Sequence, residues 1–139
     1  MDYRPLTPEL SVAPQISAAD VASIAAKGFR SIVCHRPDGE AADQPGFDEI
    51  DRAARQAGLQ AHYQPVATGG VTREQGQDFG RLFATLPKPA LAYCRSGTRS
   101  TTLWALAESG RLPTREILER AAKAGYDLTP LTARLESGG

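Results

Sequence analysis

The chain has 139 residues, a length typical of one folded domain, and 41% of them are hydrophobic while 23% are charged. Its 16 lysines and arginines balance its 16 aspartates and glutamates, which argues against nucleic acid or an anionic membrane as the main partner. No apolar stretch approaches membrane-spanning length, and no signal peptide is visible. The length predicts a single domain over residues 1–139. Because two cysteines make no disulfide framework, we expect the chain in the reducing cytoplasm.

Capping residues and glycines divide the first half of the chain into alternating strands and helices. Ser17 followed by Asp20 is typical of a helix start, and Gly28 is typical of its end. Gly58 ends a second helix, and the Pro-Asp-Gly sequence within 36–40 predicts a loop. The expected elements are an edge strand at 10–14, a helix at 17–28, a strand at 29–34, a helix at 47–57 and a strand at 59–66.

The second half contains one more apolar strand and several helices. Thr72 with Gln75 forms a capping-box pattern, and Thr114 is expected to cap a later helix that ends at Gly125. The expected elements are helices at 72–86, at 98–110, at 114–125 and at 128–135, a strand at 90–94, and a loose tail at 137–139.

Twice the order is helix, glycine, strand, at Gly28 and at Gly58, which is typical of a parallel sheet in an α/β protein. Right-handed crossovers would then place Cys34, Val66 and Cys94 at the same edge of that sheet. Ligands of such sheets bind beyond the carboxyl ends of the strands. The loops 35–46, 66–71 and 94–99 are therefore expected to surround one pocket.

The loop Cys-Arg-Ser-Gly-Thr-Arg-Ser at 94–100 carries the chemistry. Cys94 ends a strand, and the loop leads into a helix, whose first backbone N–H groups favour an anion. A thiol at the rim of this anion site is expected to lose its proton more easily and become a nucleophile, and Arg99 offers a planar fork of donors to a tetrahedral anion. The other members of the expected anion-binding loop are Arg95, Ser96, Gly97, Thr98 and Ser100.

Other reactive side chains are few. The only histidines are His35 and His62, and no spacing typical of metal ligands occurs, so neither a metal nor a cofactor is expected. Cys34 is either a buried core thiol or a resolving partner for Cys94. Arg36 and Asp38 are expected at the rim of the pocket.

Two resemblances come from these residues. The string 94–100 resembles the active-site loop of rhodanese-type sulfurtransferases, while the whole chain resembles the phosphatase-like domain of beta-lactamase-hydrolase-like proteins. The stretches that carry the second resemblance are 10–15, 28–33, 36–40, 57–59, 93–106 and 124–128. It implies a cysteine-phosphatase-like α/β fold, a small, mostly parallel sheet flanked by helices. It also implies kinship with sulfide-oxidising systems, where a persulfide-oxidising metallohydrolase-like enzyme, here a separate protein, would be a partner.

The loop departs from the cysteine phosphatases in two ways. Those enzymes place the arginine six positions after the cysteine, whereas Arg99 follows Cys94 by five. They also carry an acidic residue about thirty positions before the cysteine, where 62–70 of this chain has no carboxylate. Asp38, Glu40 or His62 would have to protonate the leaving group instead. One residue fewer tightens the ring of N–H groups, which suits a single extra sulfur atom on Cys94 better than a phosphoryl group. Sulfite leaving from thiosulfate needs no proton, so both departures favour sulfur transfer.

The leading hypothesis is therefore a sulfurtransferase. Cys94 would take the outer sulfur of thiosulfate, or of a persulfide, and pass it to a thiol acceptor, while Arg99 fixes the small anionic substrate and Ser100 hydrogen-bonds the thiolate. The first alternative is a phosphatase that uses Cys94 and Arg99 on a protein or small-molecule phosphoester. The second is a non-catalytic domain that senses an anion or binds a partner.

Overall fold

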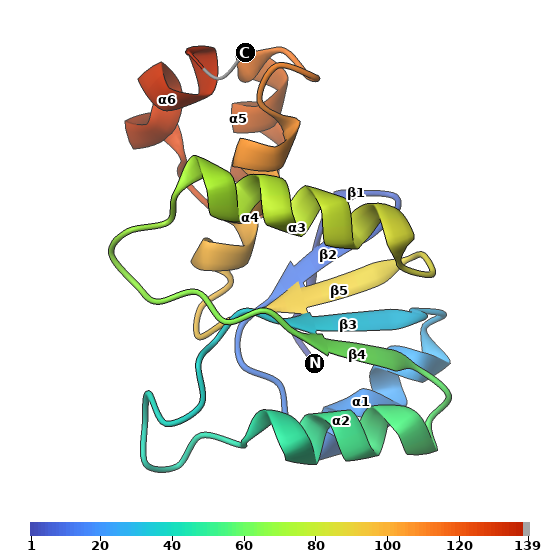
Figure 1. Ribbon diagram of the computed structural model, residues 1–139. Helices are drawn as coiled ribbons and strands as arrows, with labels where there is room; N and C mark the ends of the chain where they lie inside the picture. Colours follow the sequence, from blue (N-terminus) through green and yellow to red (C-terminus); the bar gives the residue numbers. More distant parts are fainter. Residues whose placement is uncertain (138–139) are drawn as a thin grey trace.

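A computed structural model describes residues 1–137, which form a sheet between two layers of helices (Figure 1). The strands are β1 (Arg4–Thr7), β2 (Leu10–Ala13), β3 (Ser31–Cys34), β4 (Gln60–Tyr63) and β5 (Ala90–Tyr93). The helices are α1 (Ala18–Ala26), α2 (Phe47–Gln56), α3 (Arg73–Thr85), α4 (Thr98–Glu108), α5 (Thr114–Lys123), the 3-10 helix η1 (Thr129–Leu131) and α6 (Thr132–Glu136). The last two residues of the predicted tail, 138–139, lie outside the described residues.

The sheet has the order β1-β2-β5-β3-β4, in which β1 and β2 are antiparallel and every other neighbouring pair is parallel. This confirms the predicted α/β class with a mostly parallel sheet. The predicted edge position of 10–14 is wrong, because β2 lies between β1 and β5. The edge strand on that side of the sheet is β1, which sequence patterning missed because it is short and contains Pro5. Proline lacks the N–H of an inner strand and is tolerated at an edge.

Helices cover both faces of the sheet. Figure 1 shows α1 and α2 on one face, with α3 and α4 on the other and α5 and α6 beyond them. Both predicted capping boxes are present, Ser17 with Asp20 and Thr72 with Gln75. The predicted cap at Thr114 is wrong, because that residue is already helical and no side chain caps α5. The helix expected at 128–135 is divided into η1 and α6.

Helix α4 is the most enclosed helix of the described chain. Every residue from Arg99 to Leu106 is buried, so its sequence lacks the one-sided apolar pattern of a surface helix. It packs against α3 at Gly76, where a Cβ would approach that of Leu106 to 2.5 Å. The close approach fixes α4, and with it the arginine of the signature loop, firmly against the core.

The carboxyl ends of the parallel strands position the candidate site. The Cα partners Cys34, Tyr63 and Tyr93 align β3, β4 and β5 at one end of the sheet. The chain leaves that end in the long loops after β3 and β4, on the left of Figure 1. The N–H of Val66 donates to the carbonyl of His35 at 2.9 Å, which ties these two loops together. Within residues 1–137, no helix has the length and apolarity that crossing a bilayer requires.

Candidate active site

The signature loop closes around the sulfur of Cys94. Gly97 has φ +94° and is the N-cap of α4, a left-handed conformation that favours glycine. Its N–H donates to Sγ of Cys94 at 3.0 Å. On the outer side, the hydroxyl of Tyr126 donates to the carbonyl of Ser96 at 2.9 Å, and a Cβ at Gly97 would overlap that hydroxyl. The loop is therefore held between the sulfur and Tyr126.

Cys94 lies deeper than the sequence suggests. We expected the thiol at the rim of the site, but the residue has 0% of its surface exposed. Arg95, Ser96 and Thr98 are exposed and form the outer surface of the same loop. The thiol is therefore the floor of the site, and the loop is its wall.

Arg99 is held by an ion pair with Glu40 that leaves one edge of its guanidinium without an oxygen acceptor. Its Nη1 donates to Oε2 of Glu40 at 2.8 Å and to the carbonyl of Val66 at 2.8 Å, while Nη2 donates to Oε1 of Glu40 at 2.9 Å. Five N–H groups are available on a guanidinium, so the Nε–H and one Nη2–H remain. Within the described chain these two make no hydrogen bond to an oxygen. The pKa of Arg99 is raised, first by Glu40 and also by the nearby sulfur of Cys94.

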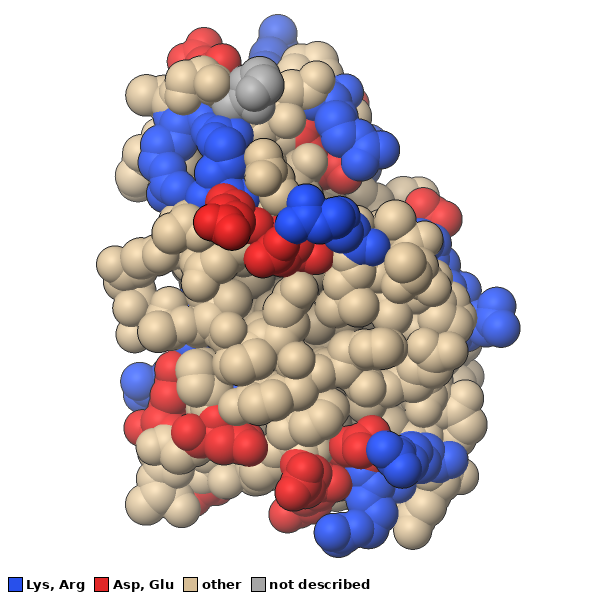
Figure 2. Space-filling model, viewed as in Figure 1, with Lys and Arg blue, Asp and Glu red and all other residues tan. Residues whose placement is uncertain are grey.

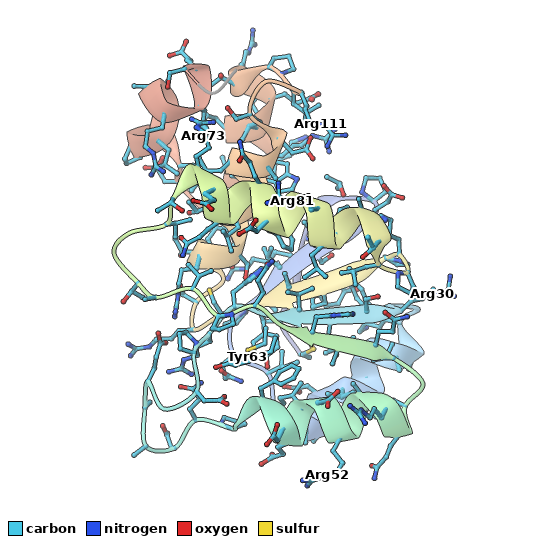
Figure 3. The ribbon with its side chains drawn as sticks, in the orientation of Figure 1. Arg30, Arg52, Tyr63, Arg73, Arg81 and Arg111 are labelled. Atoms are coloured by element: carbon cyan, nitrogen blue, oxygen red, sulfur yellow. The ribbon has the colours of Figure 1, made fainter. Side chains whose placement is uncertain are left out.

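The two residues predicted at the rim have different positions. Arg36 is buried, and it donates from Nε to Glu40 and from Nη1 to Oε1 of Gln15, each at 3.1 Å. It therefore supports Glu40 from below instead of facing the pocket. Asp38 is exposed, and its Oδ1 accepts the N–H of Phe47 at 2.9 Å, just where α2 begins. Its own N–H donates to the hydroxyl of Tyr63, which Figure 3 labels at the end of β4.

Ser100 belongs to a buried chain of hydrogen bonds that the sequence did not reveal. Its Oγ lies 2.8 Å from Nδ1 of His35, whose Nε2 lies 3.1 Å from Oε1 of Gln64. Burial lowers the pKa of His35 to about 4, so the ring is neutral near pH 7. An amide oxygen only accepts, so Nε2 carries the proton and Nδ1 accepts from Ser100. The Ser100 hydroxyl thus points its proton at His35, and not at Cys94.

None of the three substitutes considered for the missing acid is placed to donate a proton. The hydrogen bonds from Arg99 and then Arg36 lower the pKa of Glu40 and keep it ionised. Asp38 accepts the N–H of Phe47 as described above, and His62 lies in β4, 3.2 Å from Oε1 of Gln60. The loop from Gln64 to Val71 contains no carboxylate.

A pocket of about 410 Å³ opens over the signature loop. Its walls come from residues 68–71, from the first residues of α4 with Arg95 before them, and from Leu131 and Arg134 near the end of the chain. Two of the three predicted loops thus line one pocket. The third, 35–46, does not line it and acts only through the contact of Glu40 with Arg99.

The remaining candidate, Cys34, is a buried thiol of the core. The thiol of Cys34 donates to the carbonyl of Arg36 at 3.3 Å, and burial raises its pKa. Both cysteines are free thiols. No cluster of three or more histidine, cysteine, aspartate or glutamate residues that would hold a metal ion occurs within residues 1–137.

Comparison with known proteins places this site in a family context. Residues 2–111 match the family model described as the phosphatase-like domain of beta-lactamase hydrolase-like protein. A curated beta-lactamase hydrolase-like protein of Xylella fastidiosa is 37% identical over 129 residues, which are 91% of this chain. They are only 30% of the relative, so the chain spans less than a third of the length of that protein.

Comparison with solved structures also points to phosphatase-like proteins. The crystal structure of a “putative phosphatase” from Neisseria meningitidis has a TM-score of 0.89 and 36% identity, and covers 98% of this chain and 97% of its own. Kinase associated phosphatase, solved with its catalytic-site cysteine replaced by serine, has a TM-score of 0.73 and 17% identity, with 92% and 84% covered. At that identity the likeness shows the fold, which is that of the cysteine phosphatases.

Proposed function

Since the chain belongs to the family of phosphatase-like domains of beta-lactamase hydrolase-like proteins, we propose that it is a cysteine-dependent phosphatase. One observation carries the proposal: the guanidinium of Arg99 lies beside Cys94, with one edge fixed by Glu40 and the other, Nε and Nη2, bonded to no oxygen of the described chain. Two parallel N–H groups on that second edge match two oxygens of a phosphoryl group. Our first hypothesis, sulfur transfer, takes second place, because the relatives and neighbouring structures favour phosphatase chemistry.

The reaction proceeds in two displacements at phosphorus. The thiolate of Cys94 attacks, the bond from phosphorus to the leaving oxygen breaks, and the electron pair departs with that oxygen. Water then attacks the phosphocysteine, the sulfur–phosphorus bond breaks, and the thiolate returns while the water protons end on phosphate, leaving group or solvent. Throughout, the Gly97 N–H and the start of α4 stabilise negative charge on sulfur.

The missing acid restricts which esters are cleaved. A general acid contributes about 10²–10⁴-fold by protonating a departing alkoxide. Without one, the leaving oxygen must carry its own negative charge. Phosphate bound to an acidic group, such as a phenol or another phosphate, is therefore the expected substrate, and simple alkyl phosphates are expected to be poor.

The test compares 4-nitrophenyl phosphate with an alkyl phosphate, using the native chain and Cys94→Ser. We expect the aryl ester alone to be turned over, and the substitution to lower its rate by about three orders of magnitude or more. Equal rates for both esters would contradict the leaving-group argument. Turnover that survives Cys94→Ser would remove Cys94 from the mechanism.

Sulfur transfer remains the second candidate, because Arg99 follows Cys94 by five positions and because sulfite leaves without a proton. In that reaction the thiolate takes the outer sulfur of thiosulfate, the sulfur–sulfur bond breaks, and sulfite departs with the electron pair. A thiol acceptor then removes the sulfur from the Cys94 persulfide. Thiosulfate with a thiol, assayed on the same preparation, decides between the two: sulfite release without ester hydrolysis would reverse our order. A separate persulfide-oxidising metallohydrolase-like enzyme would then be the partner.

A chain that supports neither reaction would be the non-catalytic anion-binding domain of the second alternative. Binding of sulfate or phosphate that persists in Cys94→Ser, without turnover of either substrate by the native chain, is the result that would identify it.

A further inference from the structure

The pocket beside the signature loop is more basic than binding one phosphoryl group requires. Arg95, Arg99 and Arg134 all line it, and no aspartate or glutamate is among its lining residues. Glu40 neutralises Arg99 from outside the pocket. The side chains of Arg95 and Arg134 form no ion pair with any residue of the described chain. Two uncompensated positive charges therefore face the same space of about 410 Å³.

Arg134 comes from far along the chain but is fixed at this pocket. Its Nη2 donates to the carbonyl of Val71 at 2.9 Å, and its own carbonyl accepts from Arg73. Figure 3 labels Arg73 beside α6, and Figure 2 shows lysine and arginine side chains gathered there, above the uncharged loop between β4 and α3. The contacts hold α6 against the loop 68–71 and the first residue of α3. They use only part of the Arg134 fork, because a guanidinium has four more N–H groups.

Between the arginines, the wall is partly apolar. Val71 and Leu131 line the pocket and pack against the main hydrophobic core. Apolar walls with a few charged groups are typical of sites for small molecules, whose volumes run from about 300 to 1,000 Å³. The wall suits a carbon skeleton, and the arginines suit anionic groups attached to it.

We propose that this pocket binds the non-reacting part of the substrate, and that this part carries a second anionic group, phosphate or carboxylate, recognised by Arg95 and Arg134. The substrate class is then a small organic molecule with at least two anionic groups, one of them the phosphoryl group presented to Cys94. This inference rests on the proposed phosphatase function and specifies its substrate. Binding energy from the second group also positions the reacting one.

The test measures binding and not turnover, by calorimetry on Cys94→Ser protein. Fructose 1,6-bisphosphate and fructose 6-phosphate are the probes, because they differ by one phosphate. We expect the bisphosphate to bind about tenfold more tightly or better, since a charge-assisted contact is worth at least that factor. Adding Arg134→Gln should remove most of this preference by weakening the bisphosphate more than the monophosphate, whereas Arg134→Lys should keep most of it.

Arg115→Gln is the matched control. Arg115 is an exposed arginine of α5 whose hydrogen-bond partner is Glu119, and its loss should change neither affinity. Equal affinities for the two sugars, an equal effect of Arg134→Gln on both, or tighter binding of a phosphotyrosine peptide than of the bisphosphate would overturn the proposal. If the preference holds but the native chain hydrolyses no ester, the phosphatase function fails while the bis-anionic site stands.

Discussion

At the scale of single residues, the orientation of the Arg99 guanidinium depends on Glu40. The carboxylate occupies the Nη1 and Nη2 edge and thereby turns the Nε and Nη2 edge toward the sulfur. Arg36 and Gln15 complete the support, because Arg36 holds Glu40 and is itself held by Gln15. Glu40 is thus a positioning residue that reaches the substrate only through Arg99.

Glu40→Gln tests this role. The amide can accept from only one of the two Arg99 donors, and its own NH₂ opposes the other, so the guanidinium loses its fixed orientation. We expect kcat/KM for an aryl phosphate to fall by about 10²-fold, the loss typical of a misplaced binding group. Steady-state kinetics provide the measurement. An unchanged KM for substrate and an unchanged inhibition constant for phosphate would show that Arg99 keeps its orientation without Glu40.

Asp38→Asn tests whether Asp38, in the same loop as Glu40, supports the start of α2 or acts as a general acid. Asn keeps an oxygen that accepts the Phe47 N–H, so the hydrogen bond at the start of α2 is retained. Because the Asp38 carboxylate is committed to this bond, we expect the rate with aryl and alkyl phosphates to stay within about twofold of the native rate. A loss of about 10²-fold, larger for the alkyl ester, would instead identify Asp38 as the general acid.

At the scale of elements, the segment after α5 acts as a support for the signature loop. Tyr126 follows Gly125 directly and reaches back to the carbonyl of Ser96. The guanidinium of Arg4, in β1, lies 5.3 Å from the centre of the Tyr126 ring and donates to the carbonyl of Ala124. The first strand and the end of α5, which are far apart in the sequence, thus brace the same tyrosine against the catalytic loop.

We expect Gly97→Ala to lower the free energy of unfolding, because Tyr126 lies directly against Gly97. A Cβ would overlap the Tyr126 hydroxyl, and a φ of +94° strains any residue except glycine. The backbone strain alone is expected to cost about 1–3 kcal/mol of unfolding free energy. Displacement of Tyr126 adds to this cost, so we expect a lower midpoint in urea and a loop that no longer places its N–H on Cys94.

A double-mutant cycle with Tyr126→Ala isolates the contact. Removing the ring relieves the overlap but not the strain, so the two substitutions together should cost less than the sum of their separate effects. Strict additivity would mean that the glycine is required for its conformation alone. Leu118→Ala on α5, away from the loop, is a control that should add to Gly97→Ala without coupling.

At the scale of the whole molecule, the sequence predicted the fold well because local signals and the sheet agree. Capping boxes at Ser17 and Thr72 and the glycines that end helices mark the boundaries of the elements, and apolar runs mark the inner strands. What patterning missed was β1, whose four residues include a proline and carry no alternating pattern. Its place at the edge is decided by pairing with β2, which is a tertiary contact.

The site was predicted less completely, because its essential contacts join distant segments. The loop 94–100 identified Cys94 and Arg99 from residue types and spacing. The sequence could not show that Glu40 holds Arg99, that Arg134 reaches the pocket, or that Cys94 lies beneath its loop. A signal for His35 did exist, since it directly follows the strand 31–34 at the carboxyl edge of the sheet. It was considered only as a metal ligand.

His35 links the stability of the whole chain to pH. It is fully buried between Ser100 and Gln64 and touches the ring of Phe79 edge-on, with 4.9 Å between centroids. Its pKa is lowered from 6.5 to about 4, first by burial. Between these two values the unfolded chain binds a proton that the folded chain does not. Folding is therefore favoured at the higher pH, and stability is lost as pH falls toward 4.

We expect this one group to lower the free energy of unfolding by about 2 kcal/mol between pH 7 and pH 5. Urea unfolding at both pH values measures the loss, and His35→Asn, which cannot take up the proton, should show a smaller loss by that amount. Carboxylates such as Glu40 titrate in both proteins, so the difference between the two slopes isolates the imidazole. Parallel slopes would mean that His35 is protonated in the folded chain. A ring-proton NMR titration of the native protein, with no change in the His35 signals down to pH 5, would establish the neutral state even if the variant fails to fold.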